Sequence, residues 1–461
     1  MTSWMPNLKG RKGPLYQAIV TALAEDLAAG RLREGDRLPT HRDLAEALGV
    51  TVGTVTRAYA EAHRRRLVSG EVGRGTFVRR AEEVFGSWHP NSGEASEEID
   101  LTRALPVASI APEEYAEALR AVAAQPGLMG LLGYQPEAGM PAHRAAIAAW
   151  VARAGLADDP ARVVITSGAE HAISCVFGAL LQPKDTVVTE ALTYPTVKAL
   201  AAMQHVHLAG VEMDGDGLIP DALEAACRRG SVRVLYCIPT LHNPTSAVMP
   251  LRRRQEIVEI ARRHDLAIVE DDIFGFLEPE APPPLAVLAP ERTYYVSSFS
   301  KLAAPGLRVG YVVAPATGAA RVANAVFASL IMVAPVLVET AAHLVRNGTA
   351  RRQMDRQREE AAVRGRILAE TLAGAEVVTR PTSVVAWLRL PPPWGAEDFA
   401  LQAHVRGVAV TPAAKFHVGR GAAPEAVRIA LGGVSRESLR RGLASLAELV
   451  RGGPDAARGI V

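Results

Sequence analysis

Residues 297–308 read SSFSKLAAPGLR, and this stretch is the most informative part of the 461-residue chain. Lys301 follows a predicted apolar strand at residues 293–297, lies among hydroxyl groups and precedes Arg308 by seven residues. A buried amine close to cations loses its proton and becomes a nucleophile toward aldehydes. An arginine can hold a phosphate with two parallel hydrogen bonds. The stretch therefore predicts a site for an aldehyde bearing a phosphate. A Ser-Lys pair taken alone is weaker evidence, because the lysine of such a pair is more often an ordinary surface residue.

Apolar strands alternate with helices on both sides of this stretch. Strands are predicted at residues 163–166, 186–190, 232–238, 266–271, 293–297 and 309–314, and the intervening helices include residues 169–181 and 251–264. Near-continuous apolar strands separated by helices are typical of a mainly parallel sheet covered on both faces, an α/β fold. After about residue 349, a long charged helix and strands near residues 383–390 and 427–431 predict a small C-terminal α+β subdomain.

Polar residues follow four further strands of the predicted sheet. Residues 167–169 (Ser-Gly-Ala) open a helix, whose free backbone amides can receive a phosphate. Tyr194 can stack on an aromatic ring, and Asn243 can hydrogen-bond a phenolic oxygen. Asp271 ends its strand, where a carboxylate can hold a pyridinium proton. Open α/β sheets bind ligands at the carboxyl ends of their strands, so we expect these residues to meet there with Lys301.

The first 80 residues, which we call the head, differ from the rest of the chain in charge and in their pattern of predicted elements. They contain 14 basic and 8 acidic side chains, although the whole chain has a net charge of only +2. Helices are predicted at residues 15–29, from Thr40 to Gly49 and at about 52–66, followed by a glycine-rich hairpin at 67–78. This pattern predicts a winged helix-turn-helix, and the basic excess indicates a polyanionic partner. We divide the chain into residues 1–80, a linker at 81–100 and a body at 101–461.

A recognition helix presents polar and basic side chains to the major groove, and other cations contact the phosphates. Thr51, Thr54 and Arg57 lie near the start of the third predicted helix, Arg42 opens the second, and Arg74 lies in the wing. We expect these five residues to contact double-stranded DNA.

Two segments of the head carry a resemblance to a known family. Residues 38–55, LPTHRDLAEALGVTVGTV, and residues 73–78, GRGTFV, resemble the GntR superfamily of bacterial repressors. Val52 stands where that family commonly has an arginine, which puts a base-reading role at this position in doubt.

The body, from about residue 99 to 440, resembles the fold-type I aminotransferases that depend on pyridoxal 5'-phosphate. The resemblance implies that Lys301 binds the cofactor aldehyde, Asp271 pairs with the ring nitrogen, Asn243 contacts the ring hydroxyl and Tyr194 stacks on the ring. It assigns the phosphate to Ser167, Gly168, Ala169, Ser298 and Arg308. By the same likeness Tyr134 reaches the cofactor phosphate of a partner subunit, and Arg428 binds a substrate carboxylate. No metal site is expected.

Three positions depart from that pattern or leave it open. Aminotransferases usually place a tyrosine two or three residues after the pyridine-binding aspartate, but here these positions are Ile273 and Phe274. Glu170 adds a negative charge close to the predicted phosphate site. Asp272 competes with Asp271 for the ring nitrogen.

A GntR-type head joined to an aminotransferase-like body resembles the MocR branch of GntR regulators. The likeness implies a transcription factor, usually a head-to-tail homodimer, that binds operator DNA and senses a small amino compound or a vitamin B6 vitamer. An active aminotransferase with an accessory DNA-binding domain is the alternative, and a binding module with a structural cofactor is a third reading. The missing tyrosine favours the regulator.

A cytoplasmic location is expected, because the chain has three scattered cysteines and no apolar leader. The longest apolar run, residues 325–338, is too short to cross a bilayer and is predicted to be one buried or interface helix.

Overall fold

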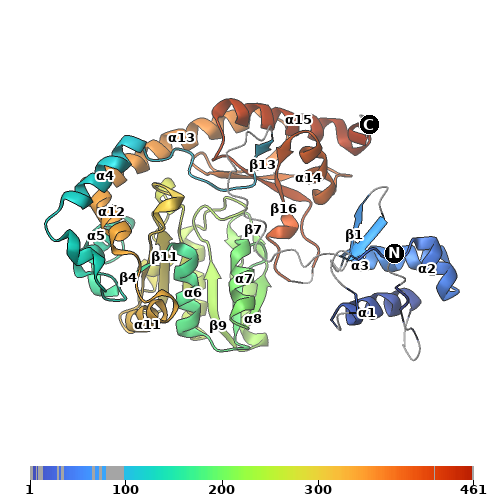
Figure 1. The fold of residues 1–461 in the computed structure, drawn as a ribbon, viewed down its shortest axis with the longest axis horizontal. Coiled ribbons are helices and arrows are strands. Elements are labelled where there is room, and N and C mark those ends of the chain that lie inside the picture. Colours follow the sequence, from blue (N-terminus) through green and yellow to red (C-terminus); the bar gives the residue numbers. More distant parts are fainter. Residues whose placement is uncertain are drawn as a thin grey trace. The chain divides into compact units, whose positions relative to one another are not determined.

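The computed structural model describes residues 4–6, 8, 14–28, 31–32, 36–64, 68–71, 75–78, 98–419 and 421–458. The chain divides into two compact units, residues Met1–Ser92 and Gly93–Val461, which are drawn in Figure 1 and described separately here. The predicted linker at residues 81–100 lies largely outside the described residues, and its last two residues form strand β3 (Ile99–Asp100).

The first unit contains helices α1 (Leu15–Ala28), α2 (His41–Leu48) and α3 (Val52–Arg64) and an antiparallel hairpin of β1 (Val68–Glu71) and β2 (Gly75–Val78). The Thr40 hydroxyl accepts a hydrogen bond from Asp43 N and so caps α2, as its spacing predicts. Gly49 ends α2 with φ of 64°, a left-handed conformation that favours glycine. The turn therefore sets α3 against α2 in the winged helix-turn-helix expected from the sequence.

The second unit is built on a seven-stranded sheet of order β4-β12-β11-β10-β9-β5-β6. All neighbouring strands are parallel except β12, which is antiparallel to β4 and β11. The strands are β4 (Val163–Thr166), β5 (Thr186–Glu190), β6 (His207–Val211), β9 (Val232–Cys237), β10 (Ala267–Asp271), β11 (Thr293–Ser298) and β12 (Gly310–Val313). The mainly parallel sheet is confirmed.

Successive strand residues point to opposite faces of this sheet, and each face is covered by helices. Val164 packs in one core with α6 (Ala169–Leu180), α7 (Pro195–Met203) and α11 (Ala319–Leu330). Its neighbours Val163 and Ile165 pack in another core with α5 (Pro141–Val151) and α12 (Pro335–Arg346). Burial on both faces explains why the strands are almost uniformly apolar.

The remaining elements of this subdomain complete its covering layers. They are α4 (Pro112–Ala124), α8 (Pro220–Arg229), α9 (Leu251–Arg263), α10 (Leu285–Leu288) and the short hairpin of β7 (Met213–Asp214) and β8 (Gly217–Leu218).

The apolar run at residues 325–338 does not form one helix, so that expectation is wrong. Helix α11 ends at Leu330, Ile331 adopts φ of 65°, and α12 begins at Pro335. Proline has no backbone N–H and is compatible with the first turn of a helix, where that N–H would be unpaired. Pro335 therefore starts a second helix rather than lying inside the first.

The C-terminal subdomain is an antiparallel sheet, β13 (Glu376–Val378), β14 (Val385–Arg389), β17 (Ala426–Ala430) and β16 (Thr411–Pro412), covered by helices. The helices are α13 (Thr349–Thr371), α14 (Ala396–Val405) and α15 (Arg436–Arg458), coloured orange to red in Figure 1. Strand β3 pairs with β15 (Val408–Ala409), so the chain enters the body through this subdomain. Among the described helices, none is both long and apolar enough to cross a membrane.

The capping bond of Thr40 can be tested directly. Thr40→Ala should cost about 1 kcal/mol of local stability, because one amide at the start of α2 loses its partner. We expect amides of His41–Leu48 to exchange with solvent roughly 5-fold faster, measured by hydrogen-exchange mass spectrometry. Thr40→Ser keeps the acceptor and should exchange as the unmodified protein does. Equal exchange in Thr40→Ala would contradict the capping role.

Candidate functional site

The residues predicted to form the site lie at one edge of the large sheet. Parallel strands end at the same edge, so Ser167 after β4, Tyr194 after β5 and Asn243 after β9 come together with Asp271 at the end of β10. Lys301 follows β11 by three residues. The fold therefore gathers these five residues from widely separated parts of the chain.

Lys301 is half-buried among charged side chains. Its Nζ donates a hydrogen bond to Ala104 O at 2.8 Å. Burial, followed by the charge of Arg428, lowers the pKa of the Lys301 amine to about 8, and Arg308 acts in the same direction while Glu170 and Asp271 oppose them. Roughly a tenth of this amine is therefore uncharged at pH 7, and the uncharged form is the one that attacks an aldehyde.

Asp271 presents one oxygen that no described residue satisfies. Its Oδ2 accepts a hydrogen bond from the Tyr236 hydroxyl at 2.5 Å, but its Oδ1 is buried without a partner. Burial raises the pKa of the Asp271 carboxyl to about 7. A buried acceptor of this kind suits a protonated ring nitrogen, which would satisfy the oxygen and restore the charged form.

Asp272 has different surroundings from its neighbour. Its Oδ1 is also buried without a partner among the described residues, but its Oδ2 accepts a hydrogen bond from the Tyr295 hydroxyl at 2.7 Å, and its charge interacts with Arg254. The charge of Asp271 raises the pKa of both Lys301 and Tyr194, so Asp271 lies close to both side chains. The geometry therefore favours Asp271 as the carboxylate that faces Lys301.

A glycine shapes the turn at the start of α6. Gly168 adopts φ of 88°, and a Cβ atom at this position would lie 2.6 Å from Arg308 Nη2. Only glycine therefore lets the Arg308 guanidinium approach the turn, where it donates to Ser167 O at 3.1 Å. The first amides of a helix have no partner within it, so an anion bound here would meet N–H groups, the helix dipole and a guanidinium.

Two side chains near this turn affect what it can bind. His171 Nδ1 accepts a hydrogen bond from Ser167 N at 3.0 Å, which leaves the amides of Gly168 and Ala169 for an anion. Burial, followed by the charge of Arg308, lowers the pKa of His171 and favours the neutral ring that this bond needs. Ser298 is buried at the end of β11 on the same edge of the sheet.

Glu170 is exposed, and its carboxylate binds Tyr194. Its Oε1 accepts hydrogen bonds from the Tyr194 hydroxyl at 2.5 Å and from the Thr196 hydroxyl at 3.3 Å. Burial and the nearby Glu170 charge raise the pKa of Tyr194, so its phenol stays protonated. Glu170 thus holds the ring that is predicted to stack, which is a role that the sequence did not indicate.

Arg428 lies on β17 and is 6% exposed. It donates to Asn243 Oδ1 at 3.0 Å and to Thr102 O, and its guanidinium lies 4.8 Å from the centre of the Phe416 ring. Because Asn243 uses its oxygen for Arg428, its amide N–H groups are oriented away from that bond and remain available as donors. A buried guanidinium facing the site is suited to bind a carboxylate.

Several predicted residues lie away from this cluster. Tyr134 is 83% exposed and is not part of the site within one chain. Ile273 and Phe274 pack in an apolar cluster, and neither offers a hydroxyl group. The described residues contain no group of three or more histidines, cysteines and carboxylates placed to hold a metal ion.

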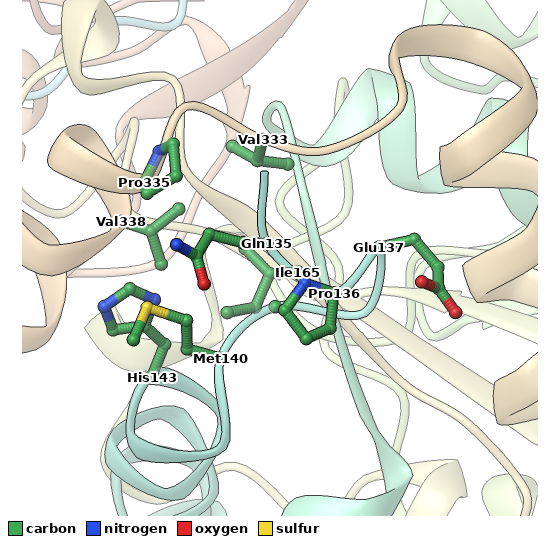
Figure 2. A pocket seen from close by; sticks show the side chains of 10 residues that line it. Gln135, Pro136, Glu137, Met140, His143, Ile165, Val333, Pro335 and Val338 are labelled. Atoms are coloured by element: carbon green, nitrogen blue, oxygen red, sulfur yellow. The ribbon is translucent and has the colours of Figure 1, made fainter. Parts of the chain in front are cut away.

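Figure 2 shows a separate small pocket between residues 135–140 and the start of α12. His143 and Pro335 are among its lining residues. The His143 ring forms a 2.8 Å hydrogen bond with the buried Glu339 carboxylate, so its polar group is satisfied within the core. None of the residues predicted to bind the cofactor lines this pocket.

In the head, Thr51, Thr54 and Arg57 lie at or near the start of α3. Thr51 accepts a hydrogen bond from Thr54 N at 3.2 Å and so caps α3, and Arg42 is exposed on α2. The Arg57 guanidinium lies 4.4 Å from the centre of the Tyr16 ring of α1, which restricts the side chain while leaving it exposed. Arg74 lies outside the described residues.

Comparison with protein families gives one match for each unit. Residues 108–446 match the family described as aminotransferase class I and II, and residues 15–78 match the bacterial regulatory proteins of the gntR family.

Among similar proteins, the HTH-type transcriptional regulator YdeF of Bacillus subtilis (strain 168) is 28% identical over 97% of this chain and 97% of its own length. The HTH-type transcriptional regulator TauR of Rhodobacter capsulatus is 26% identical over 96% of this chain and 98% of its own. The 2-aminoadipate transaminase of Thermus thermophilus is 28% identical over 77% of this chain and 90% of its own.

Solved structures of aminotransferases superpose on the body. LysN of Thermus thermophilus, an alpha-aminoadipate aminotransferase complexed with N-(5'-phosphopyridoxyl)-L-leucine, gives a TM-score of 0.70 at 25% identity, covering 79% of this chain and 94% of that one. An archaeal alanine:glyoxylate aminotransferase gives 0.69 at 26% identity, covering 77% and 91%.

The raised pKa of Asp271 has a consequence for stability. A carboxyl whose pKa is raised from 3.8 to about 7 on folding destabilises the protein as pH rises through that range. In cofactor-free protein, Asp271→Asn should therefore raise the unfolding midpoint at pH 8 by about 2–4 °C and raise it by less than half as much at pH 5. Thermal unfolding at both pH values checks this, with the exposed Asp158→Asn as control. A uniform shift at both pH values would argue against a buried charge.

Proposed function

The chain belongs to the aminotransferase class I and II family and carries a GntR-family DNA-binding domain, and from this premise we propose that it regulates transcription in response to a small amino compound or a vitamin B6 vitamer. Relatives that match over nearly the whole chain are HTH-type transcriptional regulators, the architecture of the MocR type. The observation that carries the proposal is a half-buried Lys301 amine with a lowered pKa, beside Asp271 and Arg428, on the same chain as a winged helix-turn-helix.

Pyridoxal 5'-phosphate is the cofactor of this family, and the residues present fit it. It supplies an aldehyde that condenses with amines and a ring that withdraws electrons. Lys301 would hold the aldehyde carbon, Asp271 the ring nitrogen, and Asn243 the ring oxygen through its free N–H groups. Tyr194, oriented by Glu170, would cover the ring. The phosphate would bind at Ser167, Gly168, Ala169, Ser298 and Arg308.

Arg428 indicates the chemical class of the effector. A guanidinium buried beside the Lys301 amine favours a ligand that carries both an amino group and an acidic group. The amine would compete with Lys301 for the cofactor aldehyde, and the acidic group would bind Arg428. An amino acid or a related amino acid analogue satisfies both requirements.

An active aminotransferase is the second candidate, because Lys301, Asp271, Asn243 and Arg428 are all present and a transaminase is among the similar proteins. Catalysis also requires Lys301 to move a proton between carbon atoms, assisted by a tuned ring oxygen. Ile273 and Phe274 cannot donate a hydrogen bond to that oxygen. We infer that turnover is slow and that binding without rapid turnover suits a sensor.

The surface around Tyr134 supports a homodimer. Exposed apolar side chains occupy two neighbouring segments, and Gln135 N donates to Met332 Sδ between them. They are Met129, Leu132, Tyr134, Phe327, Leu330 and Ile331. Exposed apolar clusters of this kind mark association surfaces. A head-to-tail partner would bring the exposed Tyr134 to the other subunit's phosphate site, and a DNA-binding regulator of this kind would act in the cytoplasm.

The effector response can be separated from catalysis in one titration. Purified protein loaded with pyridoxal 5'-phosphate is titrated with a panel of amino acids and amines while the visible absorbance, the affinity for DNA upstream of its own gene and the release of oxo-acid are recorded. We expect at least one amino acid to change absorbance and DNA affinity together with little oxo-acid. Rapid multiple turnover with a DNA affinity indifferent to the donor would favour the aminotransferase.

A matched pair of lysine variants completes this experiment. Lys301→Ala should lose the visible absorbance band of the bound cofactor, because its amine is the proposed attachment point. The exposed Lys184→Ala should keep the band. The same band in both variants would remove Lys301 from the proposed site.

The DNA contacts are tested on the same upstream DNA. Arg57→Ala should weaken binding by about 1–3 kcal/mol if the side chain reads a base, and a phosphate contact should instead lower affinity for all sequences and reduce the salt slope by about one. Arg42→Ala is expected to behave in the second way. Arg252→Ala, on the exposed face of α9, serves as control. Unchanged binding by the Arg42→Ala, Arg57→Ala double variant would exclude this helix pair as the DNA-binding surface.

A further inference from the structure

Residues 101–110, which we call the strap, connect the two subdomains of the body beside the site. At one end, Leu101 N donates to Ala409 O at 2.9 Å in the C-terminal subdomain. At the other end, Ile110 N donates to Ala303 O at 3.1 Å, two residues after Lys301. The strap is therefore fixed at both ends, and its middle passes the side chains of the site.

Two site residues hold the middle of the strap through its carbonyl groups. Lys301 Nζ donates to Ala104 O at 2.8 Å, and Arg428 donates to Thr102 O. When a neutral amine condenses with an aldehyde, a C=N bond forms and the aldehyde oxygen leaves as water with both amine hydrogens. The Lys301 nitrogen then has no N–H group left for Ala104 unless it gains a proton. The bond to the strap and the bond to an aldehyde therefore compete for one nitrogen.

A buried glutamine of α13 joins the strap to the backbone of Lys301. Gln357 Oε1 accepts hydrogen bonds from Val107 N at 3.1 Å and Ala108 N at 3.2 Å. Its Nε2 donates to Lys301 O at 2.9 Å and Leu302 O at 3.1 Å. The side chain is fully buried and uses both donors and both acceptor positions. An amide satisfied in this way fixes the relative position of the two segments that it bonds.

We propose that Gln357 is a positioning residue that holds Lys301 and the strap in register, so that occupation of Lys301 by ligand changes how firmly the strap is held. This inference rests on the proposed function, since it assumes that Lys301 binds the cofactor. The strap directly follows the predicted linker and β3 in the sequence. Weaker or stronger hydrogen bonding of the strap therefore affects the part of the body that comes first after the DNA-binding head in the chain.

The first test measures the Lys301 amine in Gln357→Met, which keeps a side chain of similar length without the four hydrogen bonds. The rate at which cofactor-free full-length protein gains visible absorbance after mixing with pyridoxal 5'-phosphate is recorded against pH. We expect the midpoint to rise by about one pH unit, because a less firmly held amine becomes better solvated. The exposed Gln182→Met should match the unmodified protein. An unchanged midpoint in Gln357→Met would overturn the proposal.

The second test approaches the same link from its other end and needs no cofactor. Lys301→Met removes the donor to Ala104, and we expect the amides of Val107 and Ala108 to exchange roughly 5-fold faster by hydrogen-exchange mass spectrometry. Peptides from α14 serve as the internal reference. Unchanged exchange contradicts the link, and this test decides the matter alone if Gln357→Met does not fold. Failure of the unmodified protein to take up cofactor at any pH would instead contradict the proposed function.

Discussion

The proposed function requires one primary amine, Lys301 Nζ, to stay partly uncharged, and the charged groups at the edge of the sheet act on the pKa of that amine. Burial disfavours the charged form of the Lys301 amine, and the guanidinium groups of Arg428 and Arg308 act in the same direction. The carboxylates of Asp271 and Glu170 oppose them. The result is a pKa of about 8, at which the amine changes charge close to neutral pH.

The sheet makes this balance possible because it is rigid and buried on both faces. Strands β10 and β11 place Asp271 and Lys301 on one edge, and the helices on either side keep water away from them. The cost is visible in Asp271, whose buried Oδ1 has no partner among the described residues. Groups that are unfavourable by themselves and favourable with a ligand are typical of binding sites, since the ligand restores the lost interactions.

Patterns of apolar residues were sufficient to predict six of the seven strands of the large sheet to within a residue or two, because those strands are buried on both faces. The edge strand β6 was not among them, since most of its residues are exposed or half-buried. The break between α11 and α12 was not predictable in this way. Pro335 lies near the end of the apolar run, and the apolar pattern does not show whether such a proline ends one helix or starts another. Identities of candidate residues came from local motifs. Their partners did not, because Tyr236 and Gln357 reach the site through contacts between segments far apart in the chain. Gln357 in particular lies in a charged helix that suggests a solvated face.

The Arg428 guanidinium has two roles, because it donates a hydrogen bond to Asn243 and also faces the site. It orients the amide predicted to face the cofactor ring, and it is the cation predicted to receive an acidic ligand. An anion that draws the guanidinium toward itself weakens its hold on the amide, and the electron density of a conjugated ring depends on the hydrogen bonds made to its oxygen. The visible absorbance of the protein would then depend on the acidic group of a ligand as well as on its amine, so one spectrum would report the binding of both groups.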